Sequence, residues 1–221
     1  MAMNTCEEFR DDSAPEAAVR GFLHRPSSAS GNGLVLTHGA GANCKAPLLV
    51  ALADAFCAAG WIVLRCDLPF RQARPSGPPH PSGQERDRRG LLGAVAAMRK
   101  LHASRVFLGG HSYGGRMASM LAADEPAIAD RLLLLSYPLH PPQRPVDLRT
   151  GHFPKLQVPA LFIHGVKDGF GTIAEMTAAL KLIPAPAELI PVAGAGHELM
   201  SKRNRDELTV TIVKALTPES A

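Results

Sequence analysis

Short apolar runs alternate along the 221-residue chain with longer segments in which apolar residues recur at helical spacing. Most of the short runs are apolar throughout, which is typical of strands in a parallel sheet that is covered on both faces. The predicted strands span residues 19–23, 34–37, 61–65, 106–108, 132–135, 160–164 and 188–191. The predicted helices span residues 46–59, 85–102, 116–123, 172–182 and 201–216. This order predicts an α/β fold with a doubly wound, mostly parallel sheet flanked by helices.

Two proline-rich segments, residues 67–83 and 137–159, interrupt this pattern. The first holds five prolines and two glycines, which argues against both a helix and an internal strand there. Each segment follows a predicted strand, and loops at the carboxyl ends of parallel strands line the ligand crevice of such sheets. They are candidate walls of a substrate site, and the alternative is that they are rigid surface loops.

The charge of the chain is unevenly distributed. Residues 1–16 contain five acidic residues and one arginine, whereas residues 17–221 carry a net charge of +8. We therefore expect residues 1–16 to be an acidic, flexible N-terminal segment and residues 17–221 to form a single domain. Part of the basic excess lies in residues 65–89, which contain six arginines and three acidic residues.

Composition also excludes several classes of protein. The whole chain has a net charge of only +4 and 5% aromatic residues, with no basic helix, so we expect no nucleic-acid partner. No apolar run approaches the ~20 residues that cross a bilayer, and the first 12 residues lack the features of a secretory leader. We expect a cytoplasmic protein with no membrane partner and four reduced cysteines.

The most informative motif is V-F-L-G-G-H-S-Y-G-G at residues 106–115. An apolar strand runs directly into G-H-S-Y-G, and helical sequence follows, which is the context that the G-x-S-x-G nucleophile elbow requires. The flanking glycines permit a turn tight enough to push the serine oxygen outward. Ser112 is therefore the predicted nucleophile, at a helix N-terminus that favours developing negative charge.

A serine nucleophile needs a base, and the base needs a carboxylate that orients it. Asp168 follows the predicted strand 160–164 in a glycine-rich loop. His197 follows the strand 188–191 and is the only histidine after Asp168. An isolated Asp or His in such a loop is usually a turn former or a surface group. The order Ser112, Asp168, His197, each after a strand, instead predicts a catalytic triad.

Acyl transfer also requires hydrogen-bond donors for the oxyanion. One expected donor is the backbone N–H of Tyr113, the residue after the nucleophile. A second is expected after the strand 34–37, in the small-residue loop that begins His38-Gly39-Ala40-Gly41. We assign it to the N–H of Ala40, with Gly41 as the neighbour that could replace it.

At these motifs the sequence resembles the α/β-hydrolase superfamily over residues 19–216. More narrowly it resembles small, lid-poor hydrolases akin to dienelactone hydrolase, and among these the bacterial relatives of a testis-expressed animal protein and of a subunit of the NSL histone acetyltransferase complex. The motifs are T-H-G-A-G at 37–41, D-L-P-F-R at 67–71, G-G-H-S-Y-G-G-R at 109–116 and I-H-G-V-K-D ending at Asp168. The resemblance implies little or no lid domain. Dienelactone hydrolase has a cysteine nucleophile where this chain has Ser112, so its substrate is not carried over.

Other polar residues have weaker functional interpretations. His38, His111 and His164 each end a predicted strand and could hold a metal, but hydrogen bonding to neighbouring loops is the favoured interpretation, and we expect no metal or cofactor. Arg71 and Arg74 could bind an anionic group of the substrate, although a solvated surface is the simpler alternative.

The residues favour a serine hydrolase that cleaves carboxylic esters or thioesters of small to medium acyl groups through an acyl-enzyme. Two alternatives remain at this point. One is a non-catalytic interaction module with the same fold, and the other is an acyltransferase or perhydrolase that uses the same nucleophile. The expected partner is the small-molecule substrate, and the oligomeric state is left open.

Overall fold

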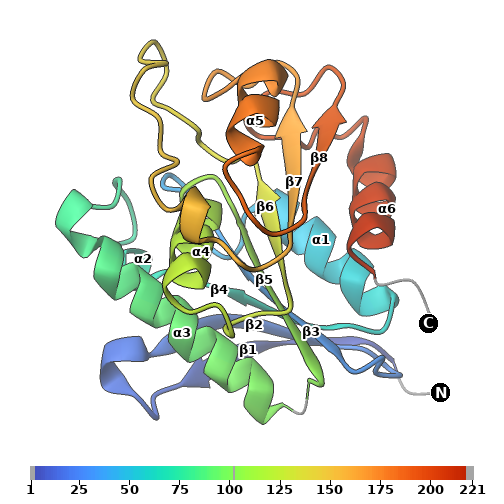
Figure 1. Ribbon diagram of the computed structural model, residues 1–221. Coiled ribbons are helices and arrows are strands. Elements are labelled where there is room, and N and C mark those ends of the chain that lie inside the picture. The colour runs from blue at the N-terminus through green and yellow to red at the C-terminus, as the bar shows by residue number, and fades with distance from the viewer. Residues whose placement is uncertain (1–2, 102, 218–221) are drawn as a thin grey trace.

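The computed structural model describes residues 3–101 and 103–217 and contains an eight-stranded sheet with helices on both faces (Figure 1). The strands lie in the order β1-β2-β4-β3-β5-β6-β7-β8. Strands β1 and β2 are antiparallel to their neighbours, and the other strands pair in parallel. The strands are β1 (Thr5–Asp11), β2 (Val19–Arg25), β3 (Asn32–Thr37), β4 (Ile62–Cys66), β5 (Arg105–His111), β6 (Arg131–Leu135), β7 (Ala160–Gly165) and β8 (Ala187–Val192).

Five longer helices cover this sheet, and all five were predicted from the hydrophobic pattern. They are α1 (Pro47–Ala58), α3 (Gln84–Lys100), α4 (Tyr113–Asp124), α5 (Ile173–Leu180) and α6 (Arg205–Leu216). Helix α6 begins later than predicted, and the predicted end of α3 at residue 102 lies outside the described residues. None of the helices in the described part of the chain has the length and apolar character needed to span a bilayer.

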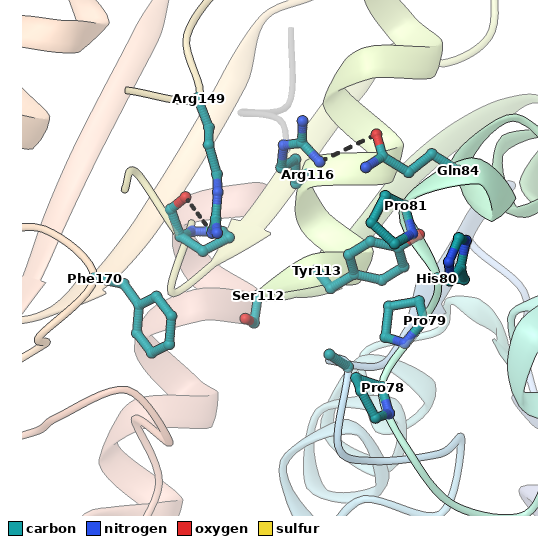
Figure 2. Close-up of a pocket in the computed structure, with 12 residues that line it drawn as sticks. Pro78, Pro79, His80, Pro81, Gln84, Ser112, Tyr113, Arg116, Arg149 and Phe170 are labelled. Carbon is teal, nitrogen blue, oxygen red and sulfur yellow. Dashed lines mark hydrogen bonds between the residues drawn. The ribbon is translucent and has the colours of Figure 1, made fainter. Parts of the chain in front are cut away.

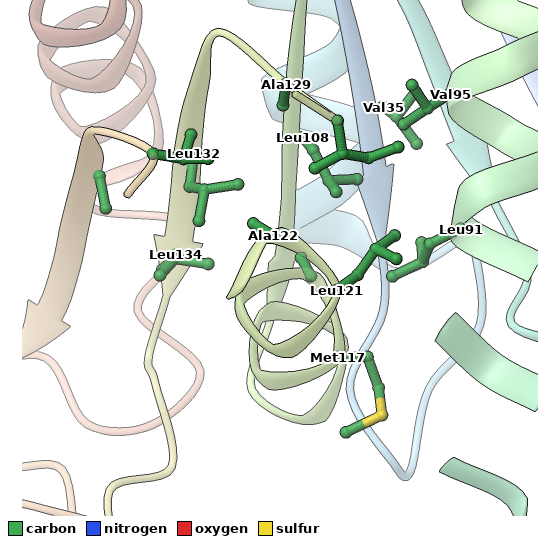
Figure 3. Packing of buried hydrophobic residues seen from close by; sticks show 14 of the residues in the cluster. Val35, Leu91, Val95, Leu108, Met117, Leu121, Ala122, Ala129, Leu132 and Leu134 are labelled. Atoms are coloured by element: carbon green, nitrogen blue, oxygen red, sulfur yellow. The ribbon is translucent and has the colours of Figure 1, made fainter. Parts of the chain in front are cut away.

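The central strands of the sheet are buried on both sides, as their continuous apolar runs predict. Helices α3, α4 and α5 pack on one face and α1 and α6 on the other (Figure 1). Within β6, Leu132 and Leu134 face the first layer, whereas Leu133 and Leu135 face the second. Figure 3 shows part of the first layer, in which Leu91 of α3, Leu121 of α4 and Leu108 of β5 belong to one buried cluster. Side chains of a strand alternate between faces, so a strand buried on both must be apolar throughout.

The N-terminal segment differs from its prediction. Residues 5–11, expected to be flexible, form strand β1, which pairs with β2 along its whole length from Thr5↔Arg25 to Asp11↔Val19. Most of its side chains are exposed, and Phe9 is the one that packs against the core. A charged strand at a sheet edge has almost no apolar signature, so the hydrophobic pattern could not reveal it.

The proline-rich segment 67–83 also holds structure that was not predicted. A short helix, α2 (Pro69–Ala73), begins at Pro69, and a 3₁₀ turn covers Pro81–Gly83. Proline at the first position of a helix loses no hydrogen bond, because that N–H has no intrahelical acceptor. The prediction that prolines exclude a helix from this segment was therefore wrong at its start.

The topology brings several loops to one edge of the sheet. The chain runs from β3 outward to β4, then crosses back so that β5 lies on the other side of β3. In such sheets the loops after adjacent strands diverge at this reversal and leave a crevice. The residue after β5, Ser112, stands at that position.

Candidate active site

Ser112 occupies a strained turn between β5 and α4. Its φ of 51° lies in the left-handed region that L residues rarely adopt, at a cost of ~1–3 kcal/mol. The glycines around it are required by space, since a Cβ at Gly110 would lie 2.8 Å from the backbone of Gly114. A Cβ at Gly114 would lie 2.6 Å from the carbonyl oxygen of His38. The sequence G-H-S-Y-G therefore forms the tight turn that its glycines predict.

The structure brings the three residues of the predicted triad together. The Ser112 hydroxyl and His197 Nε2 are 2.8 Å apart, which allows the hydroxyl to donate to the imidazole. On the other side of the ring, His197 Nδ1 lies 2.9 Å from Asp168 Oδ2. Asp168 has no exposed side-chain surface, whereas 21% of the His197 side chain is exposed. This chain of hydrogen bonds is the geometry in which an imidazole can accept the serine proton.

The loops that carry Asp168 and His197 pack against each other. The loop after β7 and the loop after β8 are joined by a hydrogen bond from Lys167 N to Ala195 O, 2.8 Å long. Their close approach requires a glycine at the end of β7, because a Cβ at Gly165 would lie 2.3 Å from Gly196 O. The small residues that surround His197 in the sequence therefore allow the two loops to pack backbone against backbone.

Asp168 is held in its charged form. Burial raises the pKa of this carboxyl group, but hydrogen bonds from His197 and from the backbone N–H of Phe170 outweigh burial and leave the pKa below its usual value. The Phe170 ring lies against the imidazole of His197, with centroids 4.3 Å apart. A buried carboxylate fixes the tautomer of the imidazole, and the aromatic ring limits the directions in which the imidazole can turn.

The two residues predicted to supply the oxyanion donors, Tyr113 and Ala40, both line the cavity at Ser112. Tyr113 is the first residue of α4, so its N–H has no acceptor within the helix. Ala40 lines the same cavity as Ser112 and Tyr113. Gly41, the alternative donor, is exposed and is not among the described residues that line this cavity. The structure thus favours the prediction of Ala40 over Gly41.

A cavity of about 380 Å³ opens in front of Ser112 (Figure 2). The proline-rich segment 67–83 forms one wall, and residues of the segment 137–159 form part of the opposite wall. Both segments therefore border the site, as expected from their positions after strands. The described residues that line the cavity are Ala40, Pro78, Pro79, His80, Pro81, Gln84, Ser112, Tyr113, Arg116, Pro138, Arg149 and Phe170.

The prediction for Arg71 and Arg74 needs correction, because neither is among the described residues lining the cavity. Arg71 is buried and donates to the carbonyl oxygens of Ala40, Ala42, Arg74 and Gly77 over 2.8–3.2 Å. Arg74 is exposed and donates to Pro78 O. With its guanidinium occupied by backbone oxygens, Arg71 braces the loop that carries Ala40 and has no geometry for binding an anion.

The three strand-end histidines bind neighbouring loops. His38 donates to Gly39 O and accepts from Leu68 N, over 2.8 and 3.1 Å. His111 and His164 each lie 2.8 Å from a backbone oxygen, that of His197 and that of Gly171. Across the residues that the structure describes, no cluster of three His, Cys, Asp or Glu side chains is placed to hold a metal ion.

Other residues at the site were not predicted. Asp87 of α3 accepts from the Tyr113 hydroxyl over 2.7 Å and from Phe70 N over 3.0 Å, and so ties α3 to the elbow. Arg116 and Arg149 line the cavity. The one signal in the sequence was the spacing of Arg116, four residues after Ser112 and hence on the same face of the helix.

Comparison with known proteins agrees with the fold. A family model described as "Alpha/beta hydrolase domain" matches residues 30–219. An alpha-beta serine hydrolase homologue from Coxiella burnetii is similar, with a TM-score of 0.77, 18% identity and coverage of 96% of this chain and 97% of that one. A dienelactone hydrolase from Anabaena variabilis has a TM-score of 0.71 at 21% identity, over 95% and 96% of the two chains. XC6422 from Xanthomonas campestris, an a/b serine hydrolase without lid, has a TM-score of 0.74 at 16% identity, over 98% of this chain and 97% of that one.

Proposed function

Because the chain belongs to the α/β-hydrolase family, we propose that it is a serine hydrolase for carboxylic esters or thioesters of small to medium acyl groups. The observation that carries this proposal is the hydrogen-bonded chain from Ser112 through His197 to Asp168, at the edge of an open cavity. The narrower resemblance to the animal NSL-complex subunit stays a prediction, as does the location in the cytoplasm. Four free cysteines, three of them buried, are compatible with that location.

In the proposed mechanism, Ser112 Oγ attacks the carbonyl carbon while its proton passes to His197 Nε2. The resulting oxyanion accepts hydrogen bonds from the N–H groups of Tyr113 and Ala40. His197 then gives its proton to the leaving oxygen or sulfur, and the acyl group remains on Ser112. Water attacks this acyl-enzyme with His197 as base, the carboxylic acid leaves, and the serine proton is restored.

Hydrolysis of p-nitrophenyl butyrate tests this proposal. We expect wild-type protein to release p-nitrophenol and Ser112→Ala to lose ~10³-fold or more in kcat/KM. A suitable control is Ser136→Ala, since Ser136 Oγ is buried without a hydrogen-bond partner in the described structure, and removing it leaves no group unsatisfied. Equal rates for wild type and Ser112→Ala would refute the mechanism. Formation of new esters when alcohols replace water would instead identify an acyltransferase.

A further inference from the structure

Two arginines, Arg116 and Arg149, line the cavity in front of Ser112 (Figure 2). Arg116 lies in the first turns of α4, where its backbone N–H donates to Ser112 O over 3.0 Å. Arg149 comes from the distant segment 137–159, so the fold brings it to the site independently of the elbow. Two cationic side chains thus border the space that a substrate of Ser112 would occupy.

Neither arginine has a carboxylate partner within 4.0 Å in the part of the chain that the structure describes. Arg116 Nη1 donates to the amide oxygen of Gln84 over 3.3 Å, and Arg149 Nη1 donates to Pro138 O over 3.3 Å. Arg116 Nε is buried and has no hydrogen-bond partner there. The contrast with Arg71, whose guanidinium binds four carbonyl oxygens, is marked.

The surroundings of these arginines do not neutralise them. No acidic side chain is found among the described residues that line the cavity. The two buried carboxylates nearby already accept hydrogen bonds, Asp168 from His197 and Asp87 from Tyr113. Burial, and secondarily the charge of Arg116, lowers the pKa of Arg149 and also lowers that of His152 to about 4. Partly buried cations without counter-ions are costly, and an anionic ligand would relieve that cost.

We propose that Arg116 and Arg149 bind a carboxylate of the substrate, so that the esters preferred by Ser112 carry a second, free carboxylate group. This inference rests on the proposed function and specifies its substrate class. A guanidinium presents paired N–H donors that match the two oxygens of a carboxylate, which makes arginine the side chain best suited to this task. The candidates for binding an anionic group in the sequence were Arg71 and Arg74, whereas this proposal assigns that role to Arg116 and Arg149.

The test compares esters that differ in one carboxylate. Mono-p-nitrophenyl glutarate and p-nitrophenyl valerate share a leaving group and place the charge on the acyl side. 4-Acetoxybenzoate and phenyl acetate place the charge on the alcohol side. We expect wild-type kcat/KM to favour the anionic member of at least one pair by about tenfold or more.

Variants assign that preference to the two arginines. In Arg116→Gln and Arg149→Gln we expect the ratio of kcat/KM for the anionic ester to kcat/KM for its neutral counterpart to fall by about tenfold. Arg116→Lys keeps the charge and should retain part of the preference. Arg144→Gln is the matched control, because Arg144 is exposed in the same segment and pairs with Asp147. A preference that is absent in wild type, or that survives in both glutamine variants, would overturn the proposal.

A binding measurement separates this proposal from the proposed function. Calorimetric titration of the wild type with glutarate, and with glutaramide as the uncharged counterpart, needs no turnover. Binding of glutarate that is lost in Arg116→Gln and Arg149→Gln supports the anion site even if no ester is hydrolysed. Hydrolysis of the neutral esters through Ser112 without any carboxylate preference would leave the proposed function standing and refute the anion site.

Discussion

Arg71 lies inside the protein with its guanidinium group spread across the backbone oxygens of two loops. It bonds to Ala40 and Ala42 in the loop after β3, and to Arg74 and Gly77 in the segment after β4. Ala40 supplies one of the proposed oxyanion donors. Arg71, which the sequence offered as a candidate substrate ligand beside the simpler alternative of a solvated surface, thus positions the loop that carries Ala40.

This role predicts the effect of removing Arg71. In Arg71→Ala four carbonyl oxygens lose their donor, so we expect the Ala40 loop to loosen and kcat to fall at least tenfold for neutral and anionic esters alike. KM should change less, and steady-state kinetics on matched esters measures both. Arg74→Ala, which removes one exposed hydrogen bond, should have little effect. Loss of activity toward anionic esters only would instead assign Arg71 to substrate binding.

The contact between Tyr113 and Asp87 is another feature of the site that the sequence did not predict. Burial raises the pKa of Asp87, and burial together with the Asp87 hydrogen bond raises the pKa of Tyr113. The phenol therefore keeps its proton and donates a hydrogen bond to the carboxyl group. Sequence order predicted the backbone role of Tyr113, because the residue after the nucleophile has a fixed place in the elbow. The partner of its side chain comes from another helix, and no local pattern reveals that.

The positions of helices and strands were predicted more completely than the contacts of individual side chains. Seven of the eight strands followed from apolar runs in the sequence, and the apolar residues of the central strands β3, β5, β6 and β7 are buried. The eighth, β1, is an exposed edge strand, and α2 starts at a proline in a segment rich in breakers. Both were missed because their stability comes from pairing and from tertiary contacts, not from an apolar stripe of their own.

The elbow between β5 and α4 depends on glycines whose replacement has a defined cost. A Cβ at Gly114 would meet both His38 O and Thr37 Cγ2 at 2.6 Å. We expect Gly114→Ala to lower the free energy of unfolding by ~1–3 kcal/mol. It should also lower kcat/KM by ~10² or more, because the Ser112 hydroxyl is displaced.

Chemical denaturation and ester hydrolysis measure these two effects. Gly151→Ala is the control, since nothing lies within 4 Å of the position that its Cβ would occupy. If Gly114→Ala kept wild-type stability and activity, the requirement for close packing at the elbow would be wrong.

The charges of the whole molecule are arranged differently from what the sequence suggested. Several of the acidic residues near the N-terminus pair with basic residues in the rest of the chain. Glu7 lies 3.1 Å from Arg25, and Asp11 lies 3.2 Å from Lys100. These pairs are exposed, so each adds little stability, but together they balance charge along the β1 edge.

One contribution to the pH dependence of unfolding comes from His152, whose Nε2 lies 2.8 Å from Ser119 Oγ. Burial, and then the charge of Arg116, lowers its pKa from 6.5 to about 4. Between these values the unfolded chain binds a proton that the folded chain does not. The free energy of unfolding therefore falls as the pH falls from 6.5 toward 4.

We therefore expect His152→Gln to flatten the fall in unfolding free energy over that interval, by up to ~3 kcal/mol. Urea denaturation of wild type and variant at several pH values measures the difference. His80→Gln, which replaces an exposed histidine, serves as the control. Parallel pH profiles for wild type and His152→Gln would show that this imidazole does not titrate as the structure indicates.

The central claim is that Ser112 is an activated nucleophile, and a fluorophosphonate probe tests it without knowledge of the substrate. The probe forms a phosphonyl ester with a serine oxygen as fluoride leaves, and only a serine with an adjacent base reacts quickly. We predict stoichiometric labelling of wild-type protein, mapped by mass spectrometry to the peptide that contains Ser112. Labelling should be absent in Ser112→Ala and strongly slowed in His197→Ala. The account would be contradicted by a wild-type protein that stays unlabelled. It would also be contradicted if wild type and Ser112→Ala were labelled to the same extent, at a residue other than Ser112.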